Sequence, residues 1–437
     1  MEPAPTLWAS LARLRGHELS RNAGWILSGQ VIGFGLQAVF FVLLARFLGV
    51  TEYGRFAGAL ALVSIVMPYS PLGAGMIFMR YVTKQPSTAA VYWGNSLTII
   101  VTTSLIIAGA FYLLGPALKV SRDPRLVLAL VAANCLCAQI VLCSSSVFQT
   151  LDRFRATAIL RLLPYLLRLA ALLALRPMLH HADAYEWSLG VLASSIVSAV
   201  IALAWVRSAI GPARLDLGLA SRRLREGVGY SFAGSTQSAY NDIDKAMLSR
   251  YGMNEQNGIY TLAYRIIDIA CTPIQAIDAA ALPRYFRFNR AGFGAVLGSA
   301  RKLVPAAALT GLGMGLCIVL AASFVPRIVG RDFSEVVIAL RWLCLLPMLR
   351  GIHQLAGGAI TGAGLQRYRT GGQLCVAISN IGLNVWLIPR FGWRGAAWAS
   401  LASDGALGLI NISLLLWLGR IFRATPPWAA TIESATE

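Results

Sequence analysis

Long apolar segments follow one another along nearly the whole chain of 437 residues, separated by short polar turns. Each is about twenty residues long, the length that an α-helix needs to cross a bilayer core ~30 Å thick. Because a segment inside lipid must satisfy its own backbone hydrogen bonds, such a chain folds as a bundle of helices. We therefore predict an all-α polytopic membrane protein with about 12 transmembrane helices.

The expected helices form two groups of six. The first six are 23–45, 56–79, 90–114, 126–149, 157–176 and 187–207. The second six are 229–250, 258–281, 303–326, 335–360, 371–389 and 395–418. The weakest candidate is 229–250, because it carries Ser, Gln, Asn, Asp and Lys side chains.

Composition excludes a water-soluble protein. Hydrophobic residues make up 57% of the chain and charged residues only 13%, whereas soluble domains carry about 25% charged residues. The same apolar content excludes a disordered chain. The excess of 38 Lys and Arg over 19 Asp and Glu does not indicate nucleic-acid binding, because these cations lie singly or in small groups between apolar segments.

The basic residues of the loops predict the orientation. The side that holds the termini has 22 of them and the other side 11, and cytoplasmic loops are the ones enriched in Lys and Arg. Both termini are therefore expected in the cytoplasm. The expected parts are an amphipathic cytoplasmic segment (1–22), an N-terminal six-helix lobe (23–208), a basic cytoplasmic linker (209–228), a C-terminal six-helix lobe (229–420) and a cytoplasmic tail (421–437).

Two short patterns recur and predict an internal duplication. The spacing from Arg46 to Gly54 returns between Arg250 and Gly258, at an offset of 204 residues. The segment 151–155 (Leu-Asp-Arg-Phe-Arg) is similar to 365–369 (Leu-Gln-Arg-Tyr-Arg), at an offset of 214. A repeat of six spans places both copies in the same orientation, related by an axis along the membrane normal, as in the parallel repeats of some transporters. A cleft is expected at the interface of such a pair.

Three runs of residues resemble bacterial oligosaccharide flippases, the exporters of O-antigen and capsule polysaccharide. They are Arg21-Asn22 with Leu43-Leu44-Ala45-Arg46 and Tyr53-Gly54, Asp244-Lys245 with Gly258-Ile259-Tyr260, and Ile388-Pro389 with Gly392 and Gly395. These flippases belong to the multidrug/oligosaccharidyl-lipid/polysaccharide exporter superfamily. The similarity covers nearly the whole chain, but its residues are mainly glycines, aromatics and helix-boundary residues. They identify a family better than they identify a substrate.

The resemblance implies two six-helix lobes around a central cavity. It also implies that a polyprenyl-diphosphate-linked oligosaccharide, such as one carried on undecaprenyl diphosphate, moves from the cytoplasmic to the outer leaflet by alternating access. The setting would be the bacterial cytoplasmic (inner) membrane during cell-surface polysaccharide or lipopolysaccharide biosynthesis. Polysaccharide polymerase and export proteins would be the partners. No resident cofactor is implied, and H⁺, Na⁺ or the membrane potential are the alternatives for coupling.

Five basic residues lie inside the expected spans: Arg168, Lys245, Arg265, Arg341 and Arg350. A charge at the centre of a span costs at least ~2.5 kcal/mol unless it faces a cavity or a partner. Arg binds a diphosphate bidentately, so we expect the four residues after Arg168 to bind substrate. Snorkelling to the interface is the alternative for Arg341, and a boundary position for Arg168. The amides of Asn380 and Asn384 are candidates for binding sugar hydroxyls, with interhelical hydrogen bonding as the alternative.

Four carboxylates in the spans are candidates for ion coupling or for salt bridges. Asp242 lies three residues before Lys245, and Asp268 three residues after Arg265, so both pairs could be structural ion pairs on one helix face. Asp244 and Asp404 are the other two, and no spacing on their own helix decides their role. In-membrane carboxylates often bind H⁺ or Na⁺ in transporters.

Catalytic motifs are absent from the sequence. It has no GxxxxGK[ST] loop for ATP, no HExxH motif and no nucleophile elbow. No Cys and His residues share a metal-ligand spacing. We therefore predict a secondary-type transporter rather than an enzyme. A cation-coupled multidrug-type exporter is the first alternative, and a membrane glycosyltransferase or polymerase of the same pathway is the second.

Overall fold

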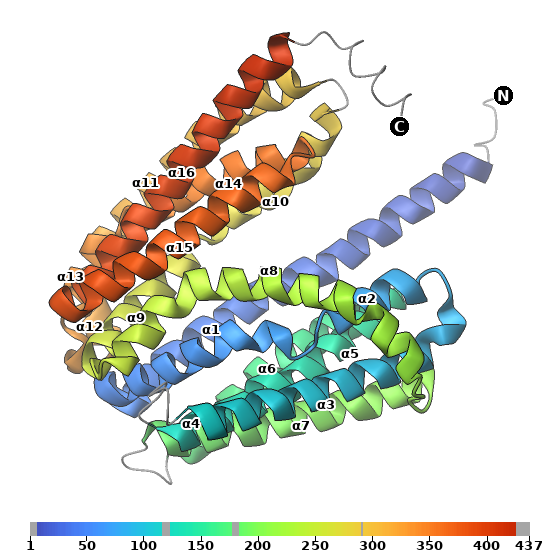
Figure 1. Ribbon diagram of the computed structural model, residues 1–437, viewed down its shortest axis with the longest axis horizontal. Coiled ribbons are helices and arrows are strands. Elements are labelled where there is room, and N and C mark those ends of the chain that lie inside the picture. Colours follow the sequence, from blue (N-terminus) through green and yellow to red (C-terminus); the bar gives the residue numbers. More distant parts are fainter. Residues whose placement is uncertain (1–6, 116–122, 177–182, 290–291, 425–437) are drawn as a thin grey trace. The chain divides into compact units, whose positions relative to one another are not determined.

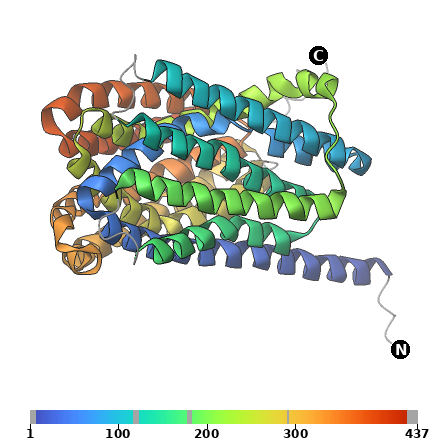
Figure 2. The same cartoon turned by 90° about the horizontal axis from the view of Figure 1, so that it is seen from below.

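The computed structural model describes residues 7–115, 123–176, 183–289 and 292–424, with side chains from Ile32 onward except at 233 and 422–424. These residues form α-helices joined by turns, and no β-strand occurs among them (Figures 1 and 2). The predicted all-α membrane fold is confirmed. Of the expected terminal segments, residues 1–6 and 425–437 lie outside the described residues.

The chain divides into two compact units, which we call unit 1 and unit 2. Unit 1 comprises Met1–Leu48 and Ala59–Ser238, and unit 2 comprises Gly49–Gly58 and Ala239–Glu437. The expected linker 209–228 belongs to unit 1 and is helical from Leu217 onward. The domain boundaries expected from the sequence remain a prediction.

The helices of unit 1 come first in the chain and are labelled α1 to α8 in Figure 1. They are α1 (Leu7–Val66), α2 (Ala74–Val82), α3 (Ala89–Leu114), α4 (Pro124–Val131), α5 (Ala138–Thr150), α6 (Phe154–Leu175), α7 (Ala184–Ile210) and α8 (Leu217–Arg250). Segment Gly49–Gly58 of α1 and the end of α8 belong to unit 2. A π-helical turn, η3 (Ala132–Cys137), joins α4 to α5.

The remaining helices belong to unit 2. They are α9 (Asn254–Ala270), α10 (Thr272–Asn289), α11 (Phe293–Ala321), α12 (Val325–Val329), α13 (Val336–Leu343), α14 (Leu346–Gly362), α15 (Gln366–Phe391) and α16 (Trp393–Ala424). Short 3₁₀ turns connect several of them.

Eight helical stretches of the described chain are long and apolar enough to cross a membrane, and two bent helix pairs bring the number to ten. Two features of the helices explain why length and composition give at most ten spans, whereas the sequence analysis predicts twelve. The stretch Ile32–Val82 has 51 residues, more than twice the length that one crossing needs, and it includes most of the first expected span and all of the second. The seventh expected span, 229–250, lies in α8, which is too polar to qualify by composition.

Unit 1 is packed around large side chains of α2, α3 and α5. Phe78, Trp93 and Phe148 are buried there. Polar contacts join the same region, because the hydroxyls of Ser70 and Ser104 both donate to the carbonyl oxygen of Cys135 in η3. A π-turn leaves carbonyl groups without helical partners, and hydroxyl groups of neighbouring helices satisfy this one inside the membrane.

Unit 2 is packed through close helix contacts at small residues. A Cβ atom at Gly311 of α11 would lie 2.5 Å from the carbonyl oxygen of Pro347, and one at Gly315 would lie 2.2 Å from that of Cys344. Small residues are what allow membrane helices to approach so closely. Because Pro347 lies at the start of α14, this contact fixes the helix that carries Arg350.

Turns of the same backbone form accompany the two segments 151–155 and 365–369 that the sequence predicts to be a repeat. The turn before α6 has Asp152 in the left-handed region, at φ 56°, and the turn before α15 has Gly364 there, at φ 78°. The backbone N–H of the following residue, Arg153 or Leu365, bonds in each case to the carbonyl five residues earlier. These two positions are 212 residues apart, and the same turn also occurs at Gly252, where the N–H of Met253 bonds to the carbonyl of Leu248. The offset of 214 residues between the side-chain patterns remains a prediction. The side-chain patterns match in type but start at different points of the turn.

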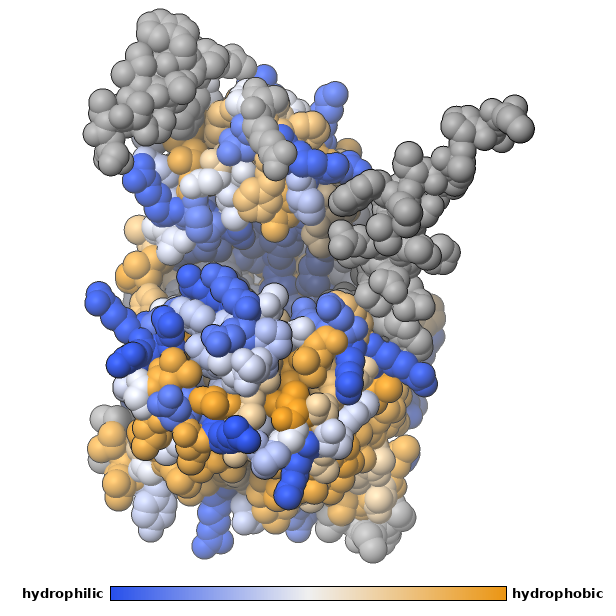
Figure 3. Space-filling model, turned by 90° about the vertical axis from the view of Figure 1, so that its right-hand side faces the viewer, coloured by the Kyte–Doolittle hydropathy of each residue, from blue (hydrophilic) through white to orange (hydrophobic). Residues whose placement is uncertain are grey.

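Hydrophilic side chains gather at the end of unit 1 where α2 ends and α8 begins (Figure 3). Arg80 of α2 pairs there with Glu226 of α8, with 2.5 Å between Nη1 and Oε1. Arg223 lies over the ring of Tyr81, 4.1 Å from its centroid. A polar end of this kind suits the membrane surface, and it belongs to the segment that the sequence predicts to be cytoplasmic.

Candidate functional site

Unit 2 holds a group of charged side chains on its membrane-spanning helices, which we call the charged cluster. It draws on α8, α9, α14 and α16, which are distant in sequence. Its members are Asp242, Asp244, Lys245, Arg265, Asp268, Arg350, His353 and Asp404. Ionisable groups inside a membrane are expensive to bury, so such a group is a candidate functional site.

Arg350 is the centre of one half of the charged cluster. Its Nη1 atom lies 2.7 Å from Oδ1 of Asp268, and its Nε atom lies 3.5 Å from Oδ2 of Asp404. Asp404 is also 3.7 Å from Nε2 of His353 and accepts a hydrogen bond from the hydroxyl of Tyr240. The Asp404 side chain is only 5% exposed, whereas that of Asp268 is 42% exposed. One guanidinium thus links a buried carboxylate to an accessible one.

Lys245 is the centre of the other half. Its ammonium lies 3.0 Å from Oδ1 of Asp242 and 3.7 Å from Oδ1 of Asp244. Asp244 is buried and accepts a hydrogen bond of 2.6 Å from the hydroxyl of Tyr260. Ser400 of α16 lies 3.0 Å from the same hydroxyl. These contacts tie α8, α9 and α16 together.

Tyr264 of α9 joins the two halves. Its ring has the Lys245 ammonium 4.8 Å from the centroid and the Arg350 guanidinium 5.5 Å from it. A cation over an aromatic face gains about 0.5–2 kcal/mol, more when it is desolvated. Tyr264 therefore holds both cations of the charged cluster near one point of α9.

The charged cluster contains one more carboxylate than it has permanent cations. Asp242, Asp244, Asp268 and Asp404 face Lys245, Arg265 and Arg350, with His353 counted as neutral. A bound proton or cation would balance this excess. No group of three or more His, Cys, Asp or Glu side chains in the described part of the chain is arranged to hold a metal ion.

The predicted site residues fall into three groups. Lys245, Arg350 and the four carboxylates lie together in the charged cluster, and Arg265 lies at its edge, 3.9 Å from Asp268. Arg341 is exposed on α13, outside the cluster. Arg168 lies in unit 1.

Asn380 and Asn384 of α15 are buried together. Asn380 donates to the hydroxyl of Ser403 on α16 over 2.9 Å, and Asn384 donates to the side chain of Asn380 over 3.0 Å. The bond to Ser403 is the kind expected from the alternative role, in which these amides form hydrogen bonds between helices. Binding of sugar by either amide remains a prediction.

Sequence reasoning missed four members of this neighbourhood: Tyr240, Tyr260, Tyr264 and His353. The aromatic residues look like ordinary membrane-helix residues in the sequence. Helical spacing could have indicated Tyr260 and Tyr264, because they lie one turn apart on the same helix as Arg265 and Asp268. His353 likewise lies three residues after Arg350, on the same face of α14.

Exchanging Asp242 and Lys245 is expected to fail as a rescue of either single alanine variant. Lys245 also faces Asp244, so the exchange would place a second carboxylate beside a buried one and move the cation to the more exposed position. We expect the exchanged protein to melt below both Asp242→Ala and Lys245→Ala, which thermal unfolding in detergent would measure. Recovery of the wild-type melting temperature would mean that the two residues form an isolated pair.

The helical architecture and the in-membrane charges define a class, a multi-pass membrane protein with a transporter fold. Residues 19–289 match the family profile described as "Polysaccharide biosynthesis protein", and the chain belongs to this family. The predicted resemblance is thereby confirmed. No curated protein sequence matches the chain.

Solved structures support the fold. The chain is similar to an inward-facing multidrug resistance MATE family transporter of the MOP superfamily, with a TM-score of 0.70 at 13% identity, covering 89% of this chain and 96% of that one. It is also similar to the lipid II flippase MurJ, with a TM-score of 0.64 at 13% identity over 91% and 87%. The MATE multidrug transporter DinF-BH gives 0.61 at 17% identity over 92% and 95%.

Proposed function

We propose that this protein is a flippase that moves a polyprenyl-diphosphate-linked oligosaccharide from the cytoplasmic to the outer leaflet of the bacterial cytoplasmic membrane. Membership of the polysaccharide biosynthesis family supports the pathway, and the likeness to transporters and to a lipid II flippase supports a fold that moves solutes. The glycan would then pass to polymerase and export proteins for cell-surface polysaccharide. The protein makes and breaks no covalent bond in this scheme.

The charged cluster is the observation that carries the proposal. This cluster holds its charges on membrane-spanning helices, pairs Lys245 with two carboxylates of α8, and joins α9, α14 and α16 through Arg350. Alternating access requires contacts that can be exchanged between two states. Arg350, shared by Asp268 and Asp404, is such a contact.

Coupling is proposed to use the surplus carboxylate of the charged cluster. Uptake of H⁺ or Na⁺ by Asp404 or Asp268 would free Arg350 from one partner and thereby favour one state over the other. The membrane potential would act on the same charges, since moving one charge across 100 mV is worth about 2.3 kcal/mol. No bound cofactor is needed.

Deleting the gene tests the proposal. The lipid-linked oligosaccharide is expected to accumulate in the cytoplasmic leaflet while surface polysaccharide falls, and a plasmid copy of the gene should reverse both. Mass spectrometry of extracted lipids, with a membrane-impermeant glycosidase applied to intact and to inverted vesicles, would measure the leaflet. Delivery to the outer leaflet at the wild-type rate in the deletion strain would refute the proposal.

A small-molecule exporter is the second candidate, and the carboxylate surplus of the charged cluster favours it. Acidic side chains inside a transporter suit a cationic drug as well as a coupling ion. The deletion strain would then retain a cationic dye such as rhodamine 6G and keep normal surface polysaccharide. The two candidates therefore give opposite results in one strain.

A further inference from the structure

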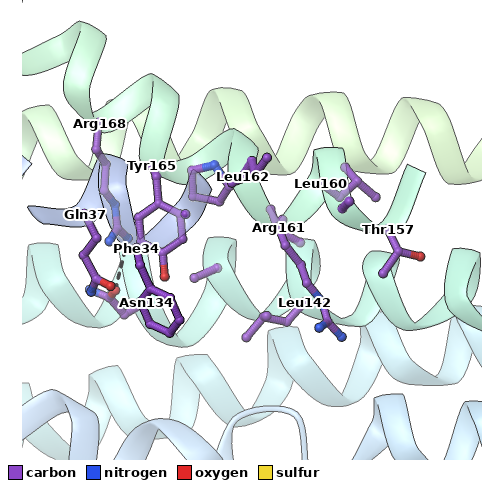
Figure 4. A pocket seen from close by; sticks show the side chains of 15 residues that line it. Phe34, Gln37, Asn134, Leu142, Thr157, Leu160, Arg161, Leu162, Tyr165 and Arg168 are labelled. Carbon is purple, nitrogen blue, oxygen red and sulfur yellow. Dashed lines mark hydrogen bonds between the residues drawn. The ribbon is translucent and has the colours of Figure 1, made fainter. Parts of the chain in front are cut away.

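Unit 1 contains a cavity of about 390 Å³ between α1, the π-turn η3, α5 and α6. This volume falls in the range of about 300–1,000 Å³ that is typical of small-molecule sites. Figure 4 shows Arg168, Gln37, Asn134, Phe34 and Tyr165 gathered at one end of it, and Arg161 with Leu142 toward the other. We call it the unit 1 pocket.

The charged residues that line the unit 1 pocket are all basic. Its fifteen lining residues include two arginines, Arg161 and Arg168, and no Asp or Glu. The carboxylates of the sequence that lie well inside expected spans all follow residue 240, so unit 1 offers Arg168 none at its depth. The cations of the charged cluster in unit 2, by contrast, already face four carboxylates.

Arg168 has a hydrogen-bond donor that no described residue accepts. Its Nη2 atom donates to Oδ1 of Asn134 over 3.3 Å, which is a long contact (Figure 4). Its Nε atom is buried and has no hydrogen-bond partner among the described residues. A guanidinium inside a membrane with one neutral, distant acceptor is far from compensated. An anion in the unit 1 pocket would supply both the charge and the missing acceptors.

The surrounding residues are arranged to keep Arg168 in place. Asn134 lies in the π-turn, and its amide nitrogen donates to the carbonyl of Leu130 over 3.0 Å. This bond turns its carbonyl oxygen toward Arg168. π-turns within helices occur frequently at functional sites.

Arg161 and Arg168 lie on one face of α6, because they are seven residues, or about two turns, apart. Their separation along the helix axis is about 10 Å. α6 begins on the side that the sequence predicts to be cytoplasmic, so Arg161 lies nearer that surface and Arg168 deeper. The lining of the unit 1 pocket also includes apolar and aromatic side chains, among them Phe34 and Leu142, which suit a hydrocarbon chain.

We propose that the unit 1 pocket binds the diphosphate of a polyprenyl-diphosphate lipid, with Arg168 as its principal cation and Arg161 as a second one closer to the cytoplasm. The inference rests on the proposed function for the identity of the lipid. The proposal assigns the diphosphate-binding site to α6, whereas the sequence analysis assigns it to the four basic residues after Arg168. The forked guanidinium of Arg168 can donate two parallel bonds to one phosphate, which a lysine cannot.

Binding of farnesyl diphosphate to the purified full-length protein, in nanodiscs of phosphatidylcholine, tests this site. Arg168→Gln is expected to weaken binding about tenfold or more, since it removes a charged donor, and Arg168→Lys should weaken it less. Arg176→Gln is the matched control, because it removes the same charge from the exposed end of the same helix and should bind like the wild type. Equal affinities of the Arg168→Gln and Arg176→Gln proteins would overturn the proposal.

Competition identifies the recognised group. Farnesol, which lacks the diphosphate, should not displace the probe, and phosphatidylglycerol should displace it only weakly. Displacement by phosphatidylglycerol as strong as by farnesyl diphosphate itself would overturn the proposal, because the pocket would then hold any anionic lipid.

Photocrosslinking of the wild-type protein gives a result that does not depend on a variant folding. A diazirine-bearing farnesyl diphosphate should label peptides that contain Phe34, Leu142 or Leu162, and labelling confined to peptides around Arg350 would overturn the site. Failure of the proposed function is a separate outcome. It would show as normal outer-leaflet delivery in the deletion strain, whatever the probe labels.

Discussion

Replacing Arg350 with alanine is expected to lower the stability of the protein by about 3–5 kcal/mol, the usual loss when one partner of a buried ion pair is removed, and to abolish transport. Arg350 is the permanent cation closest to Asp404, whose side chain is 5% exposed. Without it, that carboxylate would stay buried beside His353 and the hydroxyl of Tyr240. The melting temperature in detergent and the leaflet distribution of lipid-linked oligosaccharide would measure the two effects.

A neutral double variant separates folding from transport. Arg350→Met with Asp404→Asn removes both charges and keeps similar volumes, and such replacements of buried pairs are often neutral or stabilising. Tyr240 can still donate to the amide oxygen at position 404. We expect this protein to melt close to the wild type and to remain inactive, because the exchangeable contact is gone.

Arg341→Ala is the matched control for these variants. Arg341 is an arginine of a neighbouring span, but it is exposed on α13 and lies outside the charged cluster. Its loss should change stability by less than about 0.5 kcal/mol, as for surface positions generally, and leave transport intact. Wild-type transport by the Arg350→Ala protein would remove this residue from the mechanism.

The fold could be predicted from the sequence because lipid imposes a simple rule. Apolar segments of about twenty residues must become helices, and the described parts of the expected spans are mainly helical, although two of the spans consist of a bent pair of helices. The weakest expected span, 229–250, is also helical. It belongs to α8, a continuous helix of 34 residues from Leu217 to Arg250, and it is polar because half of the charged cluster lies at the end of this helix.

The site could be predicted only in part, for a geometric reason. Helical spacing detects partners three or four residues apart, which is how the pairing of Asp242 with Lys245 was found. Arg350 is bonded to Asp268, 82 residues away, and faces Asp404 on a third helix. Such contacts depend on how the helices pack, and one sequence contains no direct record of it.

The distribution of in-membrane charge also changes the interpretation of the arginines. Four of the five cations in the spans follow residue 240, so the sequence predicts that the substrate binds there. The carboxylates follow the same distribution and compensate three of these cations, Lys245, Arg265 and Arg350, whereas Arg341 is exposed on α13. Arg168 is the partly buried cation that has no carboxylate beside it, because the sequence of unit 1 places none at its depth. A search for an anion site should therefore weigh local pairing rather than the number of cations.

Gly54→Ala is expected to destabilise unit 2 by about 3 kcal/mol, at the upper end of what overpacking costs. A Cβ atom at Gly54 would lie 1.8 Å from the carbonyl oxygen of Asn254, and one at Gly258 would lie 2.1 Å from that of Val50. The contacts are reciprocal: Gly54 lies against Asn254, four residues before Gly258, and Gly258 lies against Val50, four residues before Gly54. The side chain of Asn257 also donates to the carbonyl of Gly54 over 2.8 Å, so that the helices cannot separate without losing this bond.

This reciprocal contact makes the glycine substitutions a test of the duplication. Gly54 and Gly258 are the matched positions of the predicted repeat, 204 residues apart, and each would place a Cβ against a carbonyl oxygen of the other helix, so we expect similar losses from Gly54→Ala and Gly258→Ala. The double variant should lose less than the sum, because helices forced apart once accept the second methyl group easily. Gly35→Ala, on α1 with nothing within 4 Å, is the control and should melt at or slightly above the wild type. Thermal unfolding of the four proteins would measure these values, and a loss at only one of the paired glycines would contradict this expectation.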